Sequence, residues 1–259
     1  MYETFEREVE DRGDGTGQFL WPRQQRSDGK WFGFNEEILS RKRAQYRNYT
    51  QFRAQYYNDP TDAALAPITR DHFQYYDKGH LRRHDGLWFF QDRRLNVFAS
   101  IDFAFSLDKR ADFTTLAVVG VDKSQNYYVL DLLRLKTDKI SDYFQAILNM
   151  YQRWGFRRLR AEATAGQAII IKDLKENYIR PYGLALSVED YKPTRGEGTK
   201  EERVLAILQS KYENGQIWHE HSGNCQLLEE ELLLQRPPHD DLKDALASAI
   251  DSAIAPIGM

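Results

Sequence analysis

The sequence lacks several features that would assign it to a familiar class of protein. Its single cysteine, Cys225, excludes an intramolecular disulfide and a cysteine-rich zinc site, and it suits a reducing compartment. No apolar run approaches the roughly 18 residues that span a bilayer. The N-terminal stretch MYETFEREVEDRGDG is acidic and polar, unlike a signal peptide. The sequence therefore predicts a soluble intracellular protein.

An overall positive charge is also missing. The formal net charge is −3 at pH 7, so a nucleic-acid partner would have to be met by local basic patches or by metal ions. No glycine-rich loop ends in Gly-Lys-Ser or Gly-Lys-Thr, and the Asp-Gly-Lys at 28–30 is followed by Trp31. ATP hydrolysis is therefore not predicted.

What the chain does contain changes character at about residue 95. Its 259 residues, 41% of them hydrophobic, are enough for one large domain or for one domain with an extension. Residues 1–95 are rich in arginine and aromatic residues and poor in valine, isoleucine and leucine, which indicates a linker or N-terminal extension. Within them, residues 36–60 predict one helix with an aromatic stripe, ended by Pro60.

Residues 96–259 have the pattern of an α/β domain. Three strand-like segments, at 96–105, 113–122 and 127–136, come first and are expected to pair antiparallel. Further strands alternate with helices, so they must run parallel through right-handed crossovers. This order predicts a ribonuclease H-like fold, with a mixed sheet of about five or more strands flanked by helices.

Two acidic residues lie at strand positions where a carboxylate is unusual. Asp102 lies inside the apolar first strand, where a charge is costly unless it is paired or bound to metal. The alternatives for Asp102 are a turn cap or an arginine partner. Glu162 ends the fourth strand, where carboxyl ends of parallel strands usually face a ligand crevice, although many such acids are helix caps. If these two strands are neighbours, both acids can share a metal ion.

The last helix, within HDDLKDALASAIDSA at 239–253, offers a third acid. Its leucine, alanine and isoleucine residues form one apolar stripe, and Asp241 lies on the flank of that stripe in the first turn. Asp241 is therefore the best third ligand on geometry, while Asp240 is either the N-cap or a further ligand. Asp244 is a weaker candidate, and Asp251 is expected on the solvated face.

Such a set of carboxylates predicts a site for two divalent cations. Hard oxygen ligands suit Mg²⁺ or Mn²⁺ rather than zinc. Two such ions, roughly 3.5–4 Å apart, can activate water and stabilise the leaving oxygen of a phosphodiester. Asp112, at the start of the second strand, is a candidate ligand of the second ion, or else a turn residue. The clustered carboxylates repel each other, so without cations the site should be strained or partly protonated.

A basic segment with two glycines, KPTRGEGTKEER, is expected beside this site. Its cations are candidates for contacts with DNA phosphates, and the alternative is an ordinary solvated loop. They are Lys192, Arg195, Lys200 and Arg203.

Four segments resemble the C-terminal nuclease domain of the tailed-bacteriophage terminase large subunit. In order, they are SIDFAFSLDKRADFTTLAVV, RAEATAGQ, KEERVLAILQSKYENGQI and HDDLKDALASAI. Upstream, FLWP and FRAQYYNDP resemble the segment that links that family's packaging ATPase to its nuclease. The resemblance covers about residues 18–255, and HDDLKDALA is its most specific motif.

This resemblance implies a metal-dependent endonuclease of ribonuclease H-like fold that cuts double-stranded viral DNA during genome packaging in the host cytoplasm. It places the essential acids at Asp102, Glu162 and the Asp240–Asp241 pair. It also implies the terminase small subunit, the portal and an ATPase domain as partners, and no membrane. Since the phosphate-binding loop is missing, we interpret the chain as the nuclease part with its linker, either excised or a separate product.

Two other functions stay open. One is another ribonuclease H-like nuclease, of the resolvase or transposase type, which a preference for four-way junctions would reveal. The other is a non-catalytic domain that docks DNA or a partner and whose acids are only surface charge. Nicking of plasmid DNA in the presence of Mn²⁺ distinguishes this domain from a nuclease.

Overall fold

The chain folds into two compact units. The computed structural model describes residues 8–46, 49–58, 68–104, 113–162, 165–192, 199–221, 223–234 and 237–257. The first unit comprises Met1–Thr69 with Glu230–His239, and the second comprises Arg70–Glu229 with Asp240–Met259. The sequence predicts a functional boundary at residue 95, between a linker and the following domain, and this boundary stays a prediction. The compact unit that holds the sheet begins at Arg70.

The first unit contains a two-stranded hairpin and a pair of helices. Strands β1 (Gln24–Gln25) and β2 (Trp31–Phe32) pair antiparallel. Helix α1 (Glu36–Gln45) is followed by α2 (Tyr49–Tyr57). The unit has a small core of its own, formed by Val9, Leu39, Phe52, Tyr57 and Leu234.

The single helix predicted over residues 36–60 is wrong. The backbone is extended at Tyr46, with φ −89° and ψ 122°, so α1 ends there and α2 begins anew. The Tyr46 ring packs edge-on against Phe52 and Tyr56, with centroid distances of 5.6 and 6.1 Å. Residues six and ten positions apart are not neighbours on one helix. The aromatic residues therefore pack the two helices together instead of forming a stripe along one.

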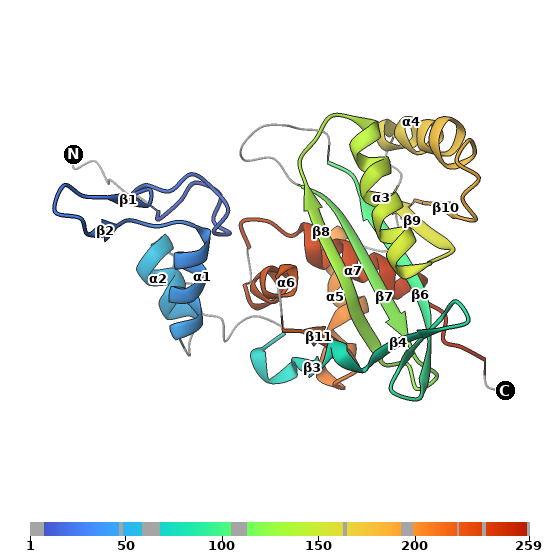
Figure 1. Ribbon diagram of the computed structural model, residues 1–259. Coiled ribbons are helices and arrows are strands. Elements are labelled where there is room, and N and C mark those ends of the chain that lie inside the picture. The colour runs from blue at the N-terminus through green and yellow to red at the C-terminus, as the bar shows by residue number, and fades with distance from the viewer. Residues whose placement is uncertain are drawn as a thin grey trace. The chain divides into compact units, whose positions relative to one another are not determined.

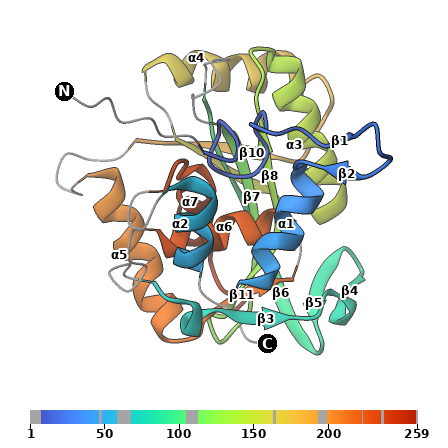
Figure 2. The ribbon, with the colours of Figure 1, turned by 90° about the vertical axis from the view of Figure 1, so that its left-hand side faces the viewer.

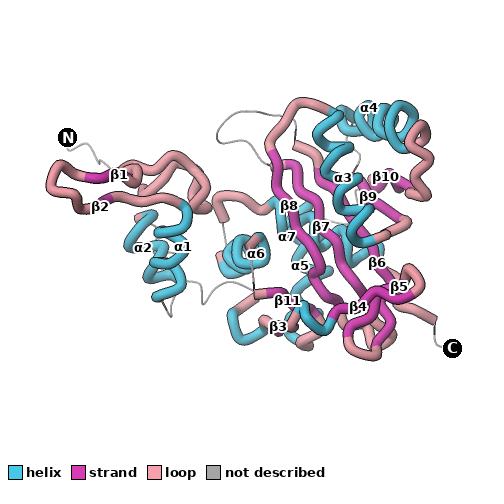
Figure 3. Tube along the Cα trace, in the orientation of Figure 1, coloured by secondary structure: helices cyan, strands magenta, loops and turns pink. Residues whose placement is uncertain are grey.

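The second unit is built on a mixed sheet (Figures 1 and 3). Its neighbouring strands follow the order β10-β9-β6-β7-β8-β11-β3, and β4 and β5 extend it from β6. The strands are β3 (Gln74–Tyr76), β4 (Leu81–His84), β5 (Leu87–Phe90), β6 (Arg93–Asp102), β7 (Thr114–Val121), β8 (Tyr127–Leu135), β9 (Arg158–Glu162), β10 (Ser187–Tyr191) and β11 (Ile217–Glu220).

Helices connect and cover these strands. They are α3 (Ile140–Trp154), α4 (Ala165–Asp173) with its π-helical continuation Leu174–Ile179, α5 (Lys200–Glu213), α6 (Asn224–Leu233) and α7 (Asp241–Ser252), and short 3₁₀ turns lie at Arg70–His72 and Lys78–His80. In the parts of the chain that the structure describes, no helix combines the length and the apolar character needed to cross a bilayer.

The strand directions are those expected of a ribonuclease H-like sheet. β6, β7 and β8 pair antiparallel, which the short connection between β7 and β8 permits. β9 then pairs parallel to β6, and β10 parallel to β9, each reached through a helix. β11 is parallel to both β8 and β3. The predicted fold class is confirmed.

Side chains of β6 point alternately to the two faces of the sheet, and their contacts show which helix covers each face. Ala99 and Ile101 belong to the core that includes Tyr143 of α3. Ser100 points the other way, and its hydroxyl donates a 2.6 Å hydrogen bond to the carbonyl oxygen of Ala245 in α7. Figure 2 shows α5 and α7 to one side of the central strands and α3 to the other. Asp102, two residues after Ser100, therefore lies on the α7 face.

Strands β3, β4 and β5 lie in a region expected to be a linker. β4 and β5 form a hairpin whose turn is Asp85-Gly86, with φ values of 49° and 77°. Two successive positive φ values are what a type I′ hairpin turn requires, and Asp-Gly is a preferred sequence for it. The Asp-Gly pair was visible in the sequence and indicates a hairpin, although few branched aliphatic residues surround it.

Candidate active site

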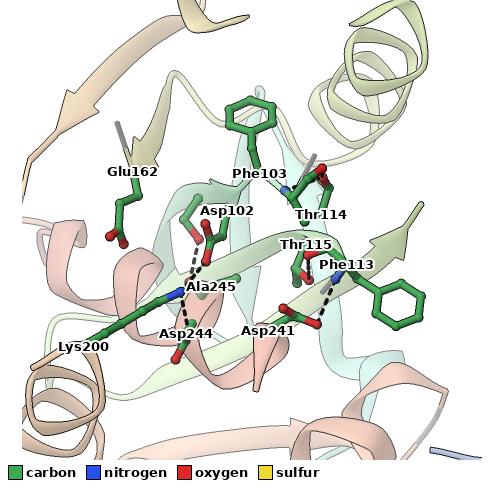
Figure 4. Close-up of polar contacts among 12 residues, drawn as sticks. Asp102, Phe103, Phe113, Thr114, Thr115, Glu162, Lys200, Asp241, Asp244 and Ala245 are labelled. Carbon is green, nitrogen blue, oxygen red and sulfur yellow. Dashed lines mark hydrogen bonds and ion pairs between the residues drawn. The ribbon is translucent and has the colours of Figure 1, made fainter. Parts of the chain in front are cut away.

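Asp102 and Glu162 lie side by side at the carboxyl ends of adjacent strands. β6 and β9 are parallel, with Ile101 paired to Ala161, so the next residue of each strand is one of the two acids. Their side chains are partly accessible, at 18% for Asp102 and 21% for Glu162. The strand neighbourhood predicted from the sequence is thus present, and both acids are on the face that α7 covers (Figure 4).

Helix α7 brings Asp244 to the same place. The hydrogen bond from Ser100 to Ala245 holds the first turns of the helix against β6, and Asp244 directly precedes Ala245. The ammonium of Lys200 lies 2.8 Å from Oδ2 of Asp102 and 2.7 Å from Oδ2 of Asp244. The two carboxylates are therefore separated by a single cation, as Figure 4 shows.

The cations come from the start of α5. Its N-terminus is fixed by a capping box, in which Thr199 accepts from the backbone N–H of Glu202 and Glu202 accepts from that of Thr199. Lys200 is the first residue of the helix, and Arg203 follows on the same side. The guanidinium of Arg203 lies 3.7 Å from Oε1 of Glu162. Lys200 and Arg203 thus face the acids.

Burial and mutual repulsion shift the protonation of these groups. Burial raises the pKa of Asp244 to about 6, the charges of Asp240 and Asp102 add to the rise, and Lys200 opposes it. The pKa of Glu162 is also raised, first by burial and then by Asp102. Burial would lower the pKa of Lys200, but Asp102 and Asp244 together outweigh it and raise that pKa. The raised pKa values of Asp244 and Glu162 have the direction expected for clustered carboxylates, and strain in the site stays a prediction.

Asp241, the preferred third ligand from helix phase, faces different neighbours. Its Oδ2 accepts a 3.1 Å hydrogen bond from the backbone N–H of Phe113 and lies 3.9 Å from the guanidinium of Arg134. That guanidinium also lies over the Phe113 ring, 3.9 Å from its centroid. Asp241 is thus directed to the start of β7, and Asp240 precedes α7 as an exposed N-cap residue without a side-chain capping bond.

The remaining predicted residues divide between described and undescribed parts of the chain. Asp112 and Arg195 lie outside the described residues. Lys192 is exposed directly after β10. Asp251 is exposed as expected, and it forms an ion pair with Arg160.

The sequence analysis placed Asp244 below Asp241 because it treated one side of α7 as solvated, whereas Asp244 is buried and contacts the ammonium that also contacts Asp102. The helix is buried at nearly every residue from Asp241 to Ile250, and it contacts α5 as well as β6 and β7. Two signals pointed to this. Small residues occur all round the helix, in ALASA, and Asp244 is three residues after Asp241, on the same side of the helix.

The donor set suits a hard divalent cation, but only after a rearrangement. Among the described residues, no three Asp, Glu, His or Cys side chains are arranged to hold a metal ion as they stand. The ammonium of Lys200 separates Asp102 from Asp244. Once it leaves, carboxylate oxygens from β6 and α7 face one another with Glu162 beside them, which are ligands that Mg²⁺ and Mn²⁺ prefer.

Comparison with known proteins gives matches among solved structures. No family model matches the chain, and no curated protein matches it. The large terminase nuclease of thermophilic phage G20c is 15% identical, covering 74% of this chain and 99% of that chain, with a TM-score of 0.48. The large terminase nuclease domain of Thermus phage P74-26 is 15% identical, covering 73% and 94%, with a TM-score of 0.45.

A third similar structure is RuvC of T. thermophilus in complex with a Holliday junction. It is 17% identical, covers 60% of this chain and 90% of that chain, and has a TM-score of 0.37. The phage G20c nuclease has also been crystallised with zinc, magnesium or cobalt bound. The solved structures that this chain resembles thus include phage large terminase nucleases and RuvC.

Proposed function

We propose that the chain is a divalent-metal-dependent endonuclease of ribonuclease H-like fold, with Asp102, Glu162 and Asp244 as its principal acids. One observation carries this proposal: Asp102 and Asp244 contact the same ammonium, and Glu162 lies on the adjoining strand. Three carboxylates this near to one another are unfavourable unless cations neutralise them, so their convergence indicates a cation site.

Two ions, Mg²⁺ or Mn²⁺, are proposed as the cofactors. Asp102, Glu162 and Asp244 would hold these ions. Asp241, Asp240 and Asp112 stay candidates for additional ligands. When bound, such a pair of ions promotes phosphodiester hydrolysis by favouring deprotonation of the attacking water and by stabilising charge on the leaving oxygen.

The chain's own residues position the reaction. The Ser100–Ala245 hydrogen bond keeps α7 against β6, so that Asp244 stays opposite Asp102. Asp241 joins α7 to the start of β7 through the Phe113 N–H. Exposed Lys192 and Arg195, which follows it in the sequence, are proposed contacts for DNA phosphates, with Lys200 and Arg203 available when they are released from the acids.

The proposed biological reaction is cleavage of double-stranded viral DNA during genome packaging. It rests on the resemblance of the four sequence segments to the terminase nuclease domain. The terminase small subunit, the portal and an ATPase domain are the partners this would require, and the host cytoplasm is where it would take place. Residues 96–259 are proposed as the nuclease part and residues 1–95 as the connection to the ATPase.

Nicking of supercoiled plasmid in the presence of Mn²⁺ tests this function. We expect the wild-type chain to nick, and Asp102→Asn and Asp244→Asn each to lower the rate by about 100-fold or more, because even residues behind a metal ligand often contribute 10- to 100-fold. Asp251→Asn is the matched control, since it makes the same change at an exposed position of the same helix, where the carboxylate pairs with Arg160 rather than with Lys200.

Full nicking by both site variants would contradict the assignment of the acids, and no nicking by the wild type would favour a docking domain. A parallel assay with linear duplex and four-way junction substrates separates the two nuclease types. Cleavage of the duplex without preference for the junction is expected here, whereas a strong junction preference would support the resolvase alternative.

A further inference from the structure

We propose that Lys200 sets the metal affinity of this site, because its ammonium occupies the cation position between Asp102 and Asp244 and must leave before a divalent ion binds there. The inference rests on the proposed metal site and adds a residue that competes for it. Lys200 would thus be a positioning residue of the ion-free site rather than only a DNA contact.

The Lys200 ammonium contacts the same carboxylate oxygens that a divalent ion would contact. Its Nζ is within 2.8 Å of one oxygen from β6 and within 2.7 Å of one from α7. A divalent ion in this place would use the same two oxygens. The Lys200 side chain is 46% exposed, while that of Asp244 is 5% exposed. The side chain that would leave is thus partly exposed, while the acid that would stay is buried.

The position of Lys200 in its helix shows that the acids hold it there. A cation at the first residue of a helix is opposed by the positive end of the helix dipole. The next two residues, Glu201 and Glu202, are acidic, as this end of a helix prefers. Lys200 is the exception in this turn, and its two short ion pairs offset the unfavourable position.

The surroundings of Arg203 favour Lys200, rather than Arg203, as the side chain that a divalent ion replaces. Its guanidinium is farther from its partner, at 3.7 Å from Glu162, and its side chain is 15% exposed, so it has less access to solvent. With both cations in place, the three acids keep one net negative charge. A first divalent ion that replaces the Lys200 ammonium while Arg203 stays would bring the sum of these charges to zero.

Titration of the ion-free chain with Mn²⁺ tests the exchange. We expect Lys200→Gln to bind Mn²⁺ more tightly than the wild type, on the order of tenfold, as is common for two ligands coupled at one site. Lys200→Arg keeps the competing charge and should stay close to the wild type. Lys172→Gln, an exposed lysine on α4, controls for the loss of one positive charge elsewhere.

Thermal unfolding gives a second readout that needs no catalysis. In EDTA, Lys200→Gln should melt below the wild type, because the acids lose a counter-charge. With saturating Mn²⁺ its rise in melting temperature should exceed that of the wild type.

The outcomes separate this inference from the proposed function. If the wild type and Lys200→Gln bind Mn²⁺ equally well, or the variant binds more weakly, Lys200 does not compete and the inference is overturned while the metal site stands. If neither binds Mn²⁺, the proposed metal site itself is overturned. If Lys200→Gln melts below the wild type in EDTA but Mn²⁺ raises both melting temperatures equally, Lys200 forms a purely structural ion pair.

Discussion

Asp241 and Asp244 lie one turn apart in α7 but have different neighbours. Asp244 contacts the ammonium that also contacts Asp102, whereas Asp241 accepts a hydrogen bond from the backbone of Phe113. The acid-rich start of the helix therefore divides between a group that faces the other acids and a group that fixes the helix to β7. At the residue scale, we expect metal affinity to depend more on Asp244 than on Asp241.

The raised pKa of Asp244 predicts how metal affinity depends on pH. Protons compete with the ion for this carboxylate, so Mn²⁺ affinity should fall as the pH drops below about 6, the pKa of Asp244. The fall should approach roughly tenfold per pH unit for each proton displaced, and Glu162, whose pKa is also raised, can add to it. Calorimetric titrations between pH 5 and pH 7.5 measure this slope.

In the ion-free protein, the contribution of Asp244 to folding stability changes with pH in the direction opposite to its effect on metal affinity. Because the folded pKa of Asp244 lies above its usual value, the stability that this group contributes is present below the usual pKa and is lost as the pH rises through about 6.

In Asp244→Asn the pH slope of Mn²⁺ binding should be shallower than in the wild type. An unchanged slope in this variant would show that other groups bind the competing protons.

At the scale of elements, the site depends on how α7 is held against β6. Ser100 is buried, and its hydroxyl donates to the Ala245 carbonyl at 2.6 Å. We expect Ser100→Ala to lower the free energy of unfolding by about 1 kcal/mol, the usual net contribution of one such hydrogen bond. It should also weaken Mn²⁺ binding, because Asp244 adjoins the bonded residue.

Urea unfolding and Mn²⁺ titration of the same variant check this prediction. Ser141→Ala is the matched control, since Ser141 is exposed in α3 on the other face of the sheet. Equal stability of Ser100→Ala and the wild type would mean that the bond does not hold the helix.

Elements with a strong local pattern could be predicted from the sequence. β7 is buried along its whole length, and its branched residues indicate a central strand. α3 has a regular apolar side that includes Phe144 and Ile147, and it ends at Gly155 in the left-handed conformation. The positions of Asp102 and Glu162 followed from these elements, since neighbouring parallel strands bring their carboxyl ends together.

Features that depend on contacts between distant segments could not be predicted in this way. The small residues of α7 indicate close packing, but nothing within α7 identifies α5 as the helix that it contacts, so the burial of Asp244 was missed. In the same way, Lys200 and Asp102 are far apart in the sequence, and their ion pair follows only from the packing of α5 beside β6 and α7. The break at Tyr46 likewise reflects packing between two helices rather than a helix-breaking residue.

At the scale of the whole molecule, the chain combines a ribonuclease H-like unit with a smaller one that has its own core. The acids, the cations from α5 and the sheet that positions them all belong to the larger unit. The metal chemistry is therefore expected to be a property of that unit. We propose that Asp102, Glu162 and Asp244 of this unit together hold divalent cations.

Diffraction from crystals of the chain soaked in Mn²⁺, recorded at the manganese absorption edge, tests this claim most directly. We predict an anomalous peak between Asp102 and Asp244, with Glu162 at the same site and the Lys200 ammonium displaced from both aspartates. An ion held by Asp241 without Asp244, or no peak near Asp102, would contradict it.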